Sequence, residues 1–244
     1  NARQFEEIWI SPKDADKPIP QNIERRRWDT IRIANRQKGC FEGVYKMFKL
    51  YPYDINVDIR EPGPDEPMPI MHDLEDGMQF DLGGGRIVTA YACPGHSPGE
   101  FIFLDEQTRT LFAGDALNYN LGVGSVPLET TLRYMKRMQE LGDKYDGIYN
   151  GHHDFRALGA PLDDDCLPTV IAMMEDALAG HIVDCQVPSP WGQDLQLTSE
   201  PVNVMAQAPG MIAGTMETRP RRVMLRRGRN FLGINPDNLY EKKD

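Results

Sequence analysis

The stretch that most constrains the fold of this chain covers residues 88–116 and reads VTAYACPGHSPGEFIFLDEQTRTLFAGDA. Apolar, partly β-branched runs alternate in it with turns marked by Pro, Gly or clustered polar residues, a pattern that predicts three strands. His96 and Asp115 stand just past the ends of two of these strands, and His152 follows a later apolar run in the same way. Functional side chains are often held on loops at the ends of rigid strands. The sequence therefore makes these three residues the candidate site.

The order of these turns resembles the metallo-β-lactamase superfamily, and within it the glyoxalase II-like hydrolases. In that family a PGH(S/T)PG turn, a hydrophobic hairpin, a GD turn, a helix and a GH turn follow one another. Here the three turns are PGHSPG at 94–99, AGD at 113–115 and NGH at 150–152. The resemblance covers residues 5–180 and implies an α+β fold, the αββα sandwich, in which two sheets pack between outer helices.

One part of the family pattern is absent. The HxHxDH motif, which supplies most ligands of the family's two-metal site, does not occur in this sequence. Residues 5–10, FEEIWI, resemble the segment that follows that motif, so by this comparison the chain is the C-terminal portion of the domain. We expect the fold to be incomplete without an N-terminal piece, either cleaved or separately encoded. The alternative, a family member that lost the motif and its strands, would leave apolar faces uncovered.

The resemblance also implies roles for the three candidates. His96 and His152 would each bind a metal ion, and Asp115 would bridge the two ions as the catalytic carboxylate. The expected cofactor is a pair of divalent ions, zinc first, with iron or manganese as alternatives. Three ligands are too few for two ions, so the N-terminal partner carrying HxHxDH would supply the rest. Taken singly, a histidine after a strand is more often a hydrogen-bonded loop residue, and Gly-Asp is a common turn.

The leading interpretation is a metal-dependent hydrolase that uses a metal-bound hydroxide on a small-molecule substrate. Esters, thioesters, lactones, lactams and phosphodiesters all remain candidates, because specificity lies in loops rather than in these motifs. Two alternatives stay open. One is an iron-dependent redox enzyme on the same fold, and the other is a non-catalytic subunit that keeps relics of the ligands.

The composition limits the kinds of binding partner and the cellular compartment that we expect. The net charge of −10 argues against nucleic-acid binding, and no apolar run approaches the length of about 20 residues that spans a membrane. The four cysteines are scattered without a CxxC pair, which indicates neither a zinc finger nor a disulfide framework. We expect a cytoplasmic protein, with a homo-oligomer of the completed unit as a further expectation.

The coarse secondary structure follows from periodicity and turn residues. Residues 1–182 are expected to form the metallo-β-lactamase-like domain, with 21–69 as an insertion that could act as a lid or a surface loop. Residues 183–244 are expected to be an extension, packed on the same domain and ending in a hairpin. Other expected elements are a hairpin at 78–93, a loop at 118–126, helices at 128–141 and 166–178, a strand at 146–150, and the terminal hairpin at 222–234.

Two smaller features have competing interpretations. His72 is expected at the start of a turn and is a weak ligand candidate. The arginines between 219 and 229 form a basic run, which we interpret as a solvated strand face paired with acidic neighbours rather than an anion site.

Overall fold

The computed structural model describes residues 5–15, 67, 69–151, 160–182, 186–188, 194–196 and 223–242. The chain forms two compact units. One comprises Asn1–Ile8, Ala15–Met71 and Pro188–Leu195, and the other comprises Trp9–Asp14, His72–Val187 and Gln196–Asp244. His96 and Asp115 belong to the second unit. The expected insertion at 21–69 lies outside the described residues except at 67 and 69.

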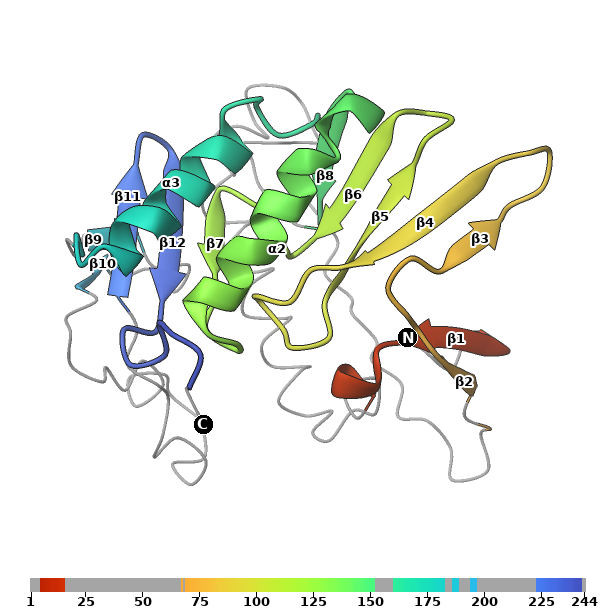
Figure 1. Cartoon of the computed structure of the whole chain (residues 1–244), viewed down its shortest axis with the longest axis horizontal. Coiled ribbons are helices and arrows are strands. Elements are labelled where there is room, and N and C mark those ends of the chain that lie inside the picture. Colours follow the sequence, from red (N-terminus) through yellow and green to blue (C-terminus); the bar gives the residue numbers. More distant parts are fainter. Residues whose placement is uncertain are drawn as a thin grey trace, which may run out of the picture. The chain divides into compact units, whose positions relative to one another are not determined.

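A five-stranded sheet forms the framework of the second unit (Figure 1). Its order is β3 (Gln79–Asp81), β4 (Ile87–Ala92), β5 (Phe101–Asp105), β6 (Thr110–Gly114) and β8 (Gly147–Asn150). The first four strands pair antiparallel, and β8 pairs parallel to β6. The predicted hairpin at 78–93 and the predicted strand at 146–150 are confirmed. The parallel pair brings the end of β8 next to the end of β6, so residues far apart in sequence meet at one edge.

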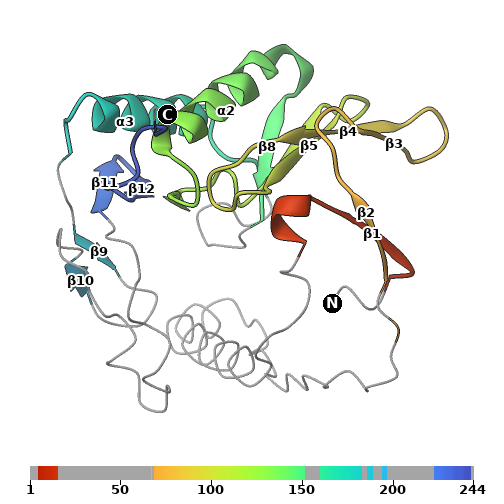
Figure 2. The same cartoon turned by 60° about the horizontal axis from the view of Figure 1, so that its bottom comes forward.

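Helices α2 (Leu128–Glu140) and α3 (Cys166–Leu178) lie on the same side of this sheet (Figure 2). Both predicted helices are confirmed. Gly180 follows α3 with φ of +86°, a conformation that ends helices and suits glycine. The core between the helices and the sheet is fully closed to solvent and includes Ile102, Leu104, Leu111, Met135, Met138 and Met174.

A second sheet contains β11 (Val223–Arg227), β12 (Asn230–Ile234) and β7 (Asn120–Gly122). The first two strands form the predicted terminal hairpin. The expectation of a loop at 118–126 is wrong at β7, which pairs parallel to β12 with Leu121 opposite Leu232. Both leucines are fully buried. A short Gly-containing segment has little strand signal of its own, so only the distant partner strand makes it one.

The remaining described elements are short. Strands β1 (Glu7–Ile10) and β2 (Ile70–Asp73) form a two-stranded sheet, as do β9 (Gln186–Pro188) and β10 (Asp194–Gln196). Single 3₁₀ turns cover Pro12–Asp14 and Gly142–Lys144. Among the described helices, neither the length nor the apolar content needed to cross a membrane is found.

The face of the five-stranded sheet away from the helices is aromatic. Phe103 lies opposite Phe112 across β5 and β6, and Phe112 lies opposite Tyr149 across β6 and β8. Side chains of paired residues project from the same face, so these three rings share it. The rings of Phe112 and Tyr149 are 6.4 Å apart, and Phe112 is 45% exposed. We name this surface, with Phe80, Val88 and Phe101 added by register, the aromatic face.

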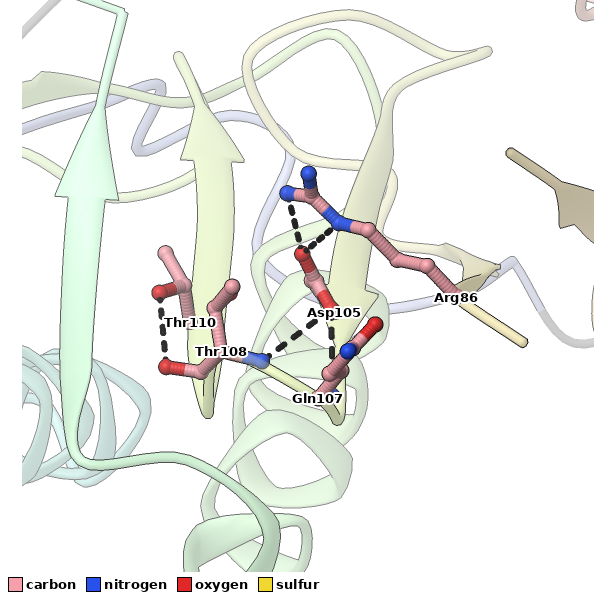
Figure 3. A network of polar contacts seen from close by, with 5 residues as sticks. All are labelled: Arg86, Asp105, Gln107, Thr108 and Thr110. Atoms are coloured by element: carbon pink, nitrogen blue, oxygen red, sulfur yellow. Dashed lines mark hydrogen bonds and ion pairs between the residues drawn. The ribbon is translucent and has the colours of Figure 1, made fainter. Parts of the chain in front are cut away.

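The β5–β6 hairpin is held by a buried carboxylate (Figure 3). Asp105 accepts hydrogen bonds from the backbone N–H groups of Gln107 and Thr108 at 3.1 and 3.2 Å, and Nε of Arg86 donates to it at 2.7 Å. Burial would raise the pKa of Asp105, but the hydrogen bonds from Arg86 and Thr108 outweigh it and hold that pKa below its usual range. The network fixes the turn between two strands of the central sheet.

In the described part of the basic run, Arg227 and Arg229 pair with acidic side chains, as predicted, whereas Arg226 donates to the carbonyl of Gly228 and lies over the ring of Phe231. Arg227 forms an ion pair with Asp176, and Arg229 forms one with Asp163. Arg229 also lies over the ring of Tyr119, 4.5 Å from its centre. These contacts join β11 and β12 to neighbouring elements.

Candidate metal centre

His96 and Asp115 come from different strand ends and meet in space. His96 stands in the loop between β4 and β5, and Asp115 directly follows β6. Gly114 before it has φ of +54°, a left-handed conformation that turns the chain at the strand end. Nε2 of His96 lies 3.8 Å from Oδ2 of Asp115, and both side chains are partly open to solvent. The antiparallel order of β4, β5 and β6 brings these two positions to the same edge of the sheet.

The second ring nitrogen of His96 faces a carbonyl group. Nδ1 lies 3.0 Å from the backbone oxygen of Gly122, at the end of β7. A carbonyl oxygen can only accept a hydrogen bond, so in the neutral ring Nδ1 must hold the proton. Nε2, which lies 3.8 Å from Oδ2 of Asp115, then carries the free lone pair. Histidines that bind metals usually donate their other ring N–H in this way, which fixes tautomer and ring orientation.

The backbone around His96 is tied to the same neighbourhood. The carbonyl oxygen of Gly95 accepts a hydrogen bond from the hydroxyl of Ser125 at 2.7 Å. The N–H of Gly95 donates to the carbonyl of Ser97 at 3.1 Å, which closes a tight turn over His96. A Cβ at Gly95 would lie 2.8 Å from Cγ2 of Thr131 on α2, so glycine allows this loop to approach the helix. These contacts fix the backbone next to His96, and the carbonyl of Gly122 fixes its ring.

His152 lies outside the described residues, and its part in the site stays a prediction. Its neighbour Gly151 is described, and the N–H of Gly151 donates to the carbonyl of Gly114 at 2.6 Å. A Cβ at Gly151 would lie 3.1 Å from Oδ1 of Asp115. Among the described residues, no cluster of three or more His, Cys, Asp or Glu side chains is placed to hold a metal ion.

Glu100 is a member of the site that sequence reasoning missed. Its Oε2 accepts a hydrogen bond from the backbone N–H of His96 at 3.2 Å. Burial first, and then the charge of Asp115, raise the pKa of Glu100 to about 8, against the lowering effect of the N–H groups of Ser97 and His96. The available signal was one acidic residue between PGHSPG and the apolar strand FIFL.

His72, the weak ligand candidate, and the thiol of Cys93 have structural surroundings. His72 lies within β2 rather than at the start of a turn, and its ring stacks on Trp9 with centres 4.7 Å apart. The strand assignment was missed because pairing with β1 adds hydrogen bonds that local propensity does not report. Cys93 is fully buried, and burial with the nearby charge of Glu100 raises its pKa to about 12, so the thiol is a small core residue.

The donors that meet here suit a divalent metal ion. An imidazole nitrogen with its tautomer fixed and a carboxylate oxygen are the N and O ligands that zinc and iron take in proteins. Two ligands do not complete a coordination shell, and four is usual for zinc. His96 and Asp115 can therefore supply some, but not all, of the ligands of a metal site.

Known proteins resemble this chain in sequence and in structure. An atrochrysone carboxyl ACP thioesterase from Emericella nidulans is 28% identical over 138 residues, which cover 56% of this chain and 39% of that protein. A hydroxyacylglutathione hydrolase from Francisella tularensis subsp. holarctica is 34% identical over 103 residues, which cover 42% of this chain and 38% of that protein. The chain thus spans well under half the length of these two relatives.

Among solved structures, a metallo-β-lactamase family protein from Thermus thermophilus aligns with a TM-score of 0.42 and 21% identity, over 71% of this chain and 54% of that chain. An archaeal metallo-β-lactamase superfamily protein from Sulfolobus tokodaii aligns with a TM-score of 0.35 and 18% identity, over 62% of this chain and 54% of that chain. The family model of the metallo-β-lactamase superfamily matches residues 25–156, more than half of the 244 residues. The chain belongs to the metallo-β-lactamase superfamily.

Proposed function

We propose that this chain is the C-terminal portion of a metal-dependent hydrolase. The observation on which this rests is the pair formed by Nε2 of His96 and Oδ2 of Asp115, 3.8 Å apart. Family membership supports divalent metal ions as the cofactor. A bound divalent ion supplies a lowered pKa for coordinated water and polarises the substrate oxygen at which charge develops.

The chain's own residues would do three things. His96 would bind through Nε2, because Nδ1 faces the carbonyl of Gly122. Asp115 would bind through its carboxylate, with His152 as the third ligand of this chain. Glu100 would keep the loop in place through the N–H of His96. Zinc is our first choice of metal, since it accepts N and O ligands without a redox role.

We further propose that an N-terminal polypeptide with an HxHxDH-type segment completes the site and covers the aromatic face. The support is physical. Phe112 is 45% exposed on a sheet face where β-sheet proteins commonly place a second layer. The three ligands proposed from this chain are too few to fill the shells of two metal ions. A piece that packs on this face would bury its rings and would make an extensive, apolar interface.

Thioesters and esters are the first substrates to test, because the similar proteins include one named a thioesterase. Lactones, lactams and phosphodiesters follow as the other members of the panel. The test is to express the chain with its completing piece, measure bound metal by mass spectrometry, and assay each substrate class. Asp115→Ala is the matched negative control.

Hydrolysis of one class, dependent on bound zinc and lost in Asp115→Ala, supports the proposal. Bound iron without hydrolysis would replace it by the redox alternative. Absence of both metal and activity in the completed protein would indicate a non-catalytic subunit. If the chain of 244 residues alone is metal-loaded and active, the completing piece is not required and that part of the proposal is wrong.

A further inference from the structure

The loop that contains His96 is held by a segment far away in sequence. Residues 96–100, here called the His96 loop, pack against the 3₁₀ turn Pro12–Asp14. Both segments belong to the same compact unit. The turn closes on itself, since the N–H of Asp14 donates to the carbonyl of Ser11 at 2.9 Å. It thereby presents the side chain of Asp14 to the loop.

Asp14 makes two contacts with the His96 loop through one oxygen. Its Oδ2 accepts a hydrogen bond from the hydroxyl of Ser97 at 2.5 Å and one from the backbone N–H of Gly99 at 3.1 Å. Asp14 is only 8% exposed. A carboxylate removed from water is retained only where donors compensate its lost hydration, and donors to a charged acceptor are the stronger kind. Both donors, Ser97 and Gly99, lie within three residues of His96.

The fit between the two segments leaves no spare volume. A Cβ added at Gly99 would lie 2.6 Å from Oγ of Ser11 and 2.9 Å from Cγ of Asp14. Such distances are shorter than any normal contact, so the approach depends on glycine. Gly99 has no left-handed φ in this structure, and steric room alone is the reason for its presence.

The opposite part of the loop is held by Glu100, which accepts from the N–H of His96. The His96 loop is thus held by the carboxyl group of Glu100 and by that of Asp14. These hydrogen bonds reach backbone N–H groups and the Ser97 hydroxyl. Their effect on the imidazole ring therefore passes through the backbone position of His96.

We propose that Asp14 is a positioning residue for His96, which sets metal affinity through Ser97 and Gly99. This inference rests on the proposed metal site. Groups that hydrogen-bond a metal ligand directly typically change metal affinity by about 10–100-fold when they are removed, and this sets the upper limit for Asp14, which contacts the loop rather than the ring. Asp14→Ala takes away the acceptor of both hydrogen bonds at once, whereas Ser97→Ala removes only the hydroxyl. Asp14→Asn keeps one acceptor oxygen and the side-chain volume.

Two measurements test the proposal on the chain, with its completing piece where one is present. The first is cobalt(II) affinity by competition with a chromophoric chelator. The second is amide hydrogen exchange of a peptide covering residues 96–100, measured without metal. The matched control is Asp146→Ala. It removes an exposed aspartate that pairs with Arg109 at 2.8 Å, at the end of β5 opposite to the His96 loop.

We expect Asp14→Ala to weaken cobalt binding by up to about 100-fold and to speed exchange in the loop but not in α2. Asp14→Asn should be intermediate. The double variant Asp14→Ala with Ser97→Ala should be no weaker than Asp14→Ala alone, because both changes remove the same hydrogen bond. The Asp146→Ala control should match the wild type in both measurements.

Unchanged cobalt affinity and unchanged loop exchange in Asp14→Ala would overturn the inference. If Asp14→Ala does not fold, Asp14→Asn and Ser97→Ala decide the question by the same two measurements. If the wild-type protein binds no cobalt at all, the metal-site proposal fails. Loop exchange then still shows whether Asp14 holds His96 in place, so the two failures are distinguishable.

Discussion

Nε2 of His96 and Oδ2 of Asp115 face one another at 3.8 Å, although 19 positions and a complete β-hairpin separate them in the chain. The hairpin of β5 and β6 creates this proximity, because it returns the chain to the sheet edge from which it left. The ring orientation comes from Gly122 on β7, which belongs to the other sheet. The site therefore depends on both sheets keeping their relative positions within this unit.

Asp115→Ala is expected to abolish hydrolysis and metal binding while the fold is preserved. Asp115 follows a strand end and is partly exposed, so its loss should cost only about 0.5 kcal/mol of unfolding free energy. The measurements are bound metal, substrate turnover and urea unfolding. Asp81→Ala is the control, since that aspartate likewise stands at a strand end, where it accepts from the N–H of Gly83 at 2.8 Å. Full activity in a folded Asp115→Ala protein would rule out the assigned role.

Gly99→Ala should destabilise the chain by about 1–3 kcal/mol, the usual cost of forcing a methyl group into a packed site. The added carbon would meet Ser11 at 2.6 Å. Gly142→Ala is the matched control, because nothing lies within 4 Å of a Cβ there and its φ is not in the left-handed region. That control should be neutral or stabilised by about 0.4–1 kcal/mol. Equal unfolding midpoints for the two variants would contradict the close approach.

Asp105 should make stability depend on pH in the acid range. Its pKa is lowered in the native state by hydrogen bonds from Arg86 and Thr108, against the effect of burial. The native state therefore binds fewer protons than the unfolded chain near the unfolded pKa of about 3.9. Asp105 stabilises the protein above that value, and its contribution disappears as pH falls through the native pKa.

The comparison that checks this is the urea midpoint of the wild type minus that of Asp105→Asn, from pH 7 downwards. The difference should be largest at neutral pH and should shrink on acidification. Arg86→Ala should reduce the same difference, because Arg86 supplies the main compensating contact. A difference that stays constant with pH would show that the carboxylate has an ordinary pKa.

Phe112→Asp should weaken association with the completing N-terminal piece. The ring is 45% exposed on the aromatic face, so the chain alone should lose only about 1 kcal/mol or less. A charge at the centre of an apolar interface is costly, which makes binding the sensitive readout. Co-purification and sedimentation measure it, with Leu82→Asp, 59% exposed at the β3–β4 turn, as control. Equal binding by both variants would place the interface elsewhere.

The local elements with strong periodicity could be predicted from the sequence. The helix at Leu128–Glu140 has an apolar stripe at helical spacing, and the hairpin around 83–85 is marked by three consecutive glycines. The order of the PGHSPG and AGD turns also made His96 and Asp115 candidates. In each case the signal lies within a short window, where side-chain chemistry and backbone preference agree.

Contacts between distant segments could not be predicted in this way. Strand β7 exists because β12 pairs with it, and that pairing joins residues more than a hundred positions apart. Asp14 and Glu100 look like ordinary acidic residues in the sequence, and only their hydrogen bonds in the folded chain show that they hold the His96 loop.

The residues that could bind a metal ion can be identified from the amino-acid sequence, because ligand chemistry is a property of side chains. Which nitrogen of His96 can bind a metal ion depends on the tertiary structure. The carbonyl of Gly122, on another strand, accepts a hydrogen bond from Nδ1–H and leaves Nε2 for the metal. The tertiary structure also decided how the ring is held, through the hydrogen bonds of the His96 loop. Hydrogen bonds and van der Waals contacts act over a few ångströms in space, whatever the separation along the chain.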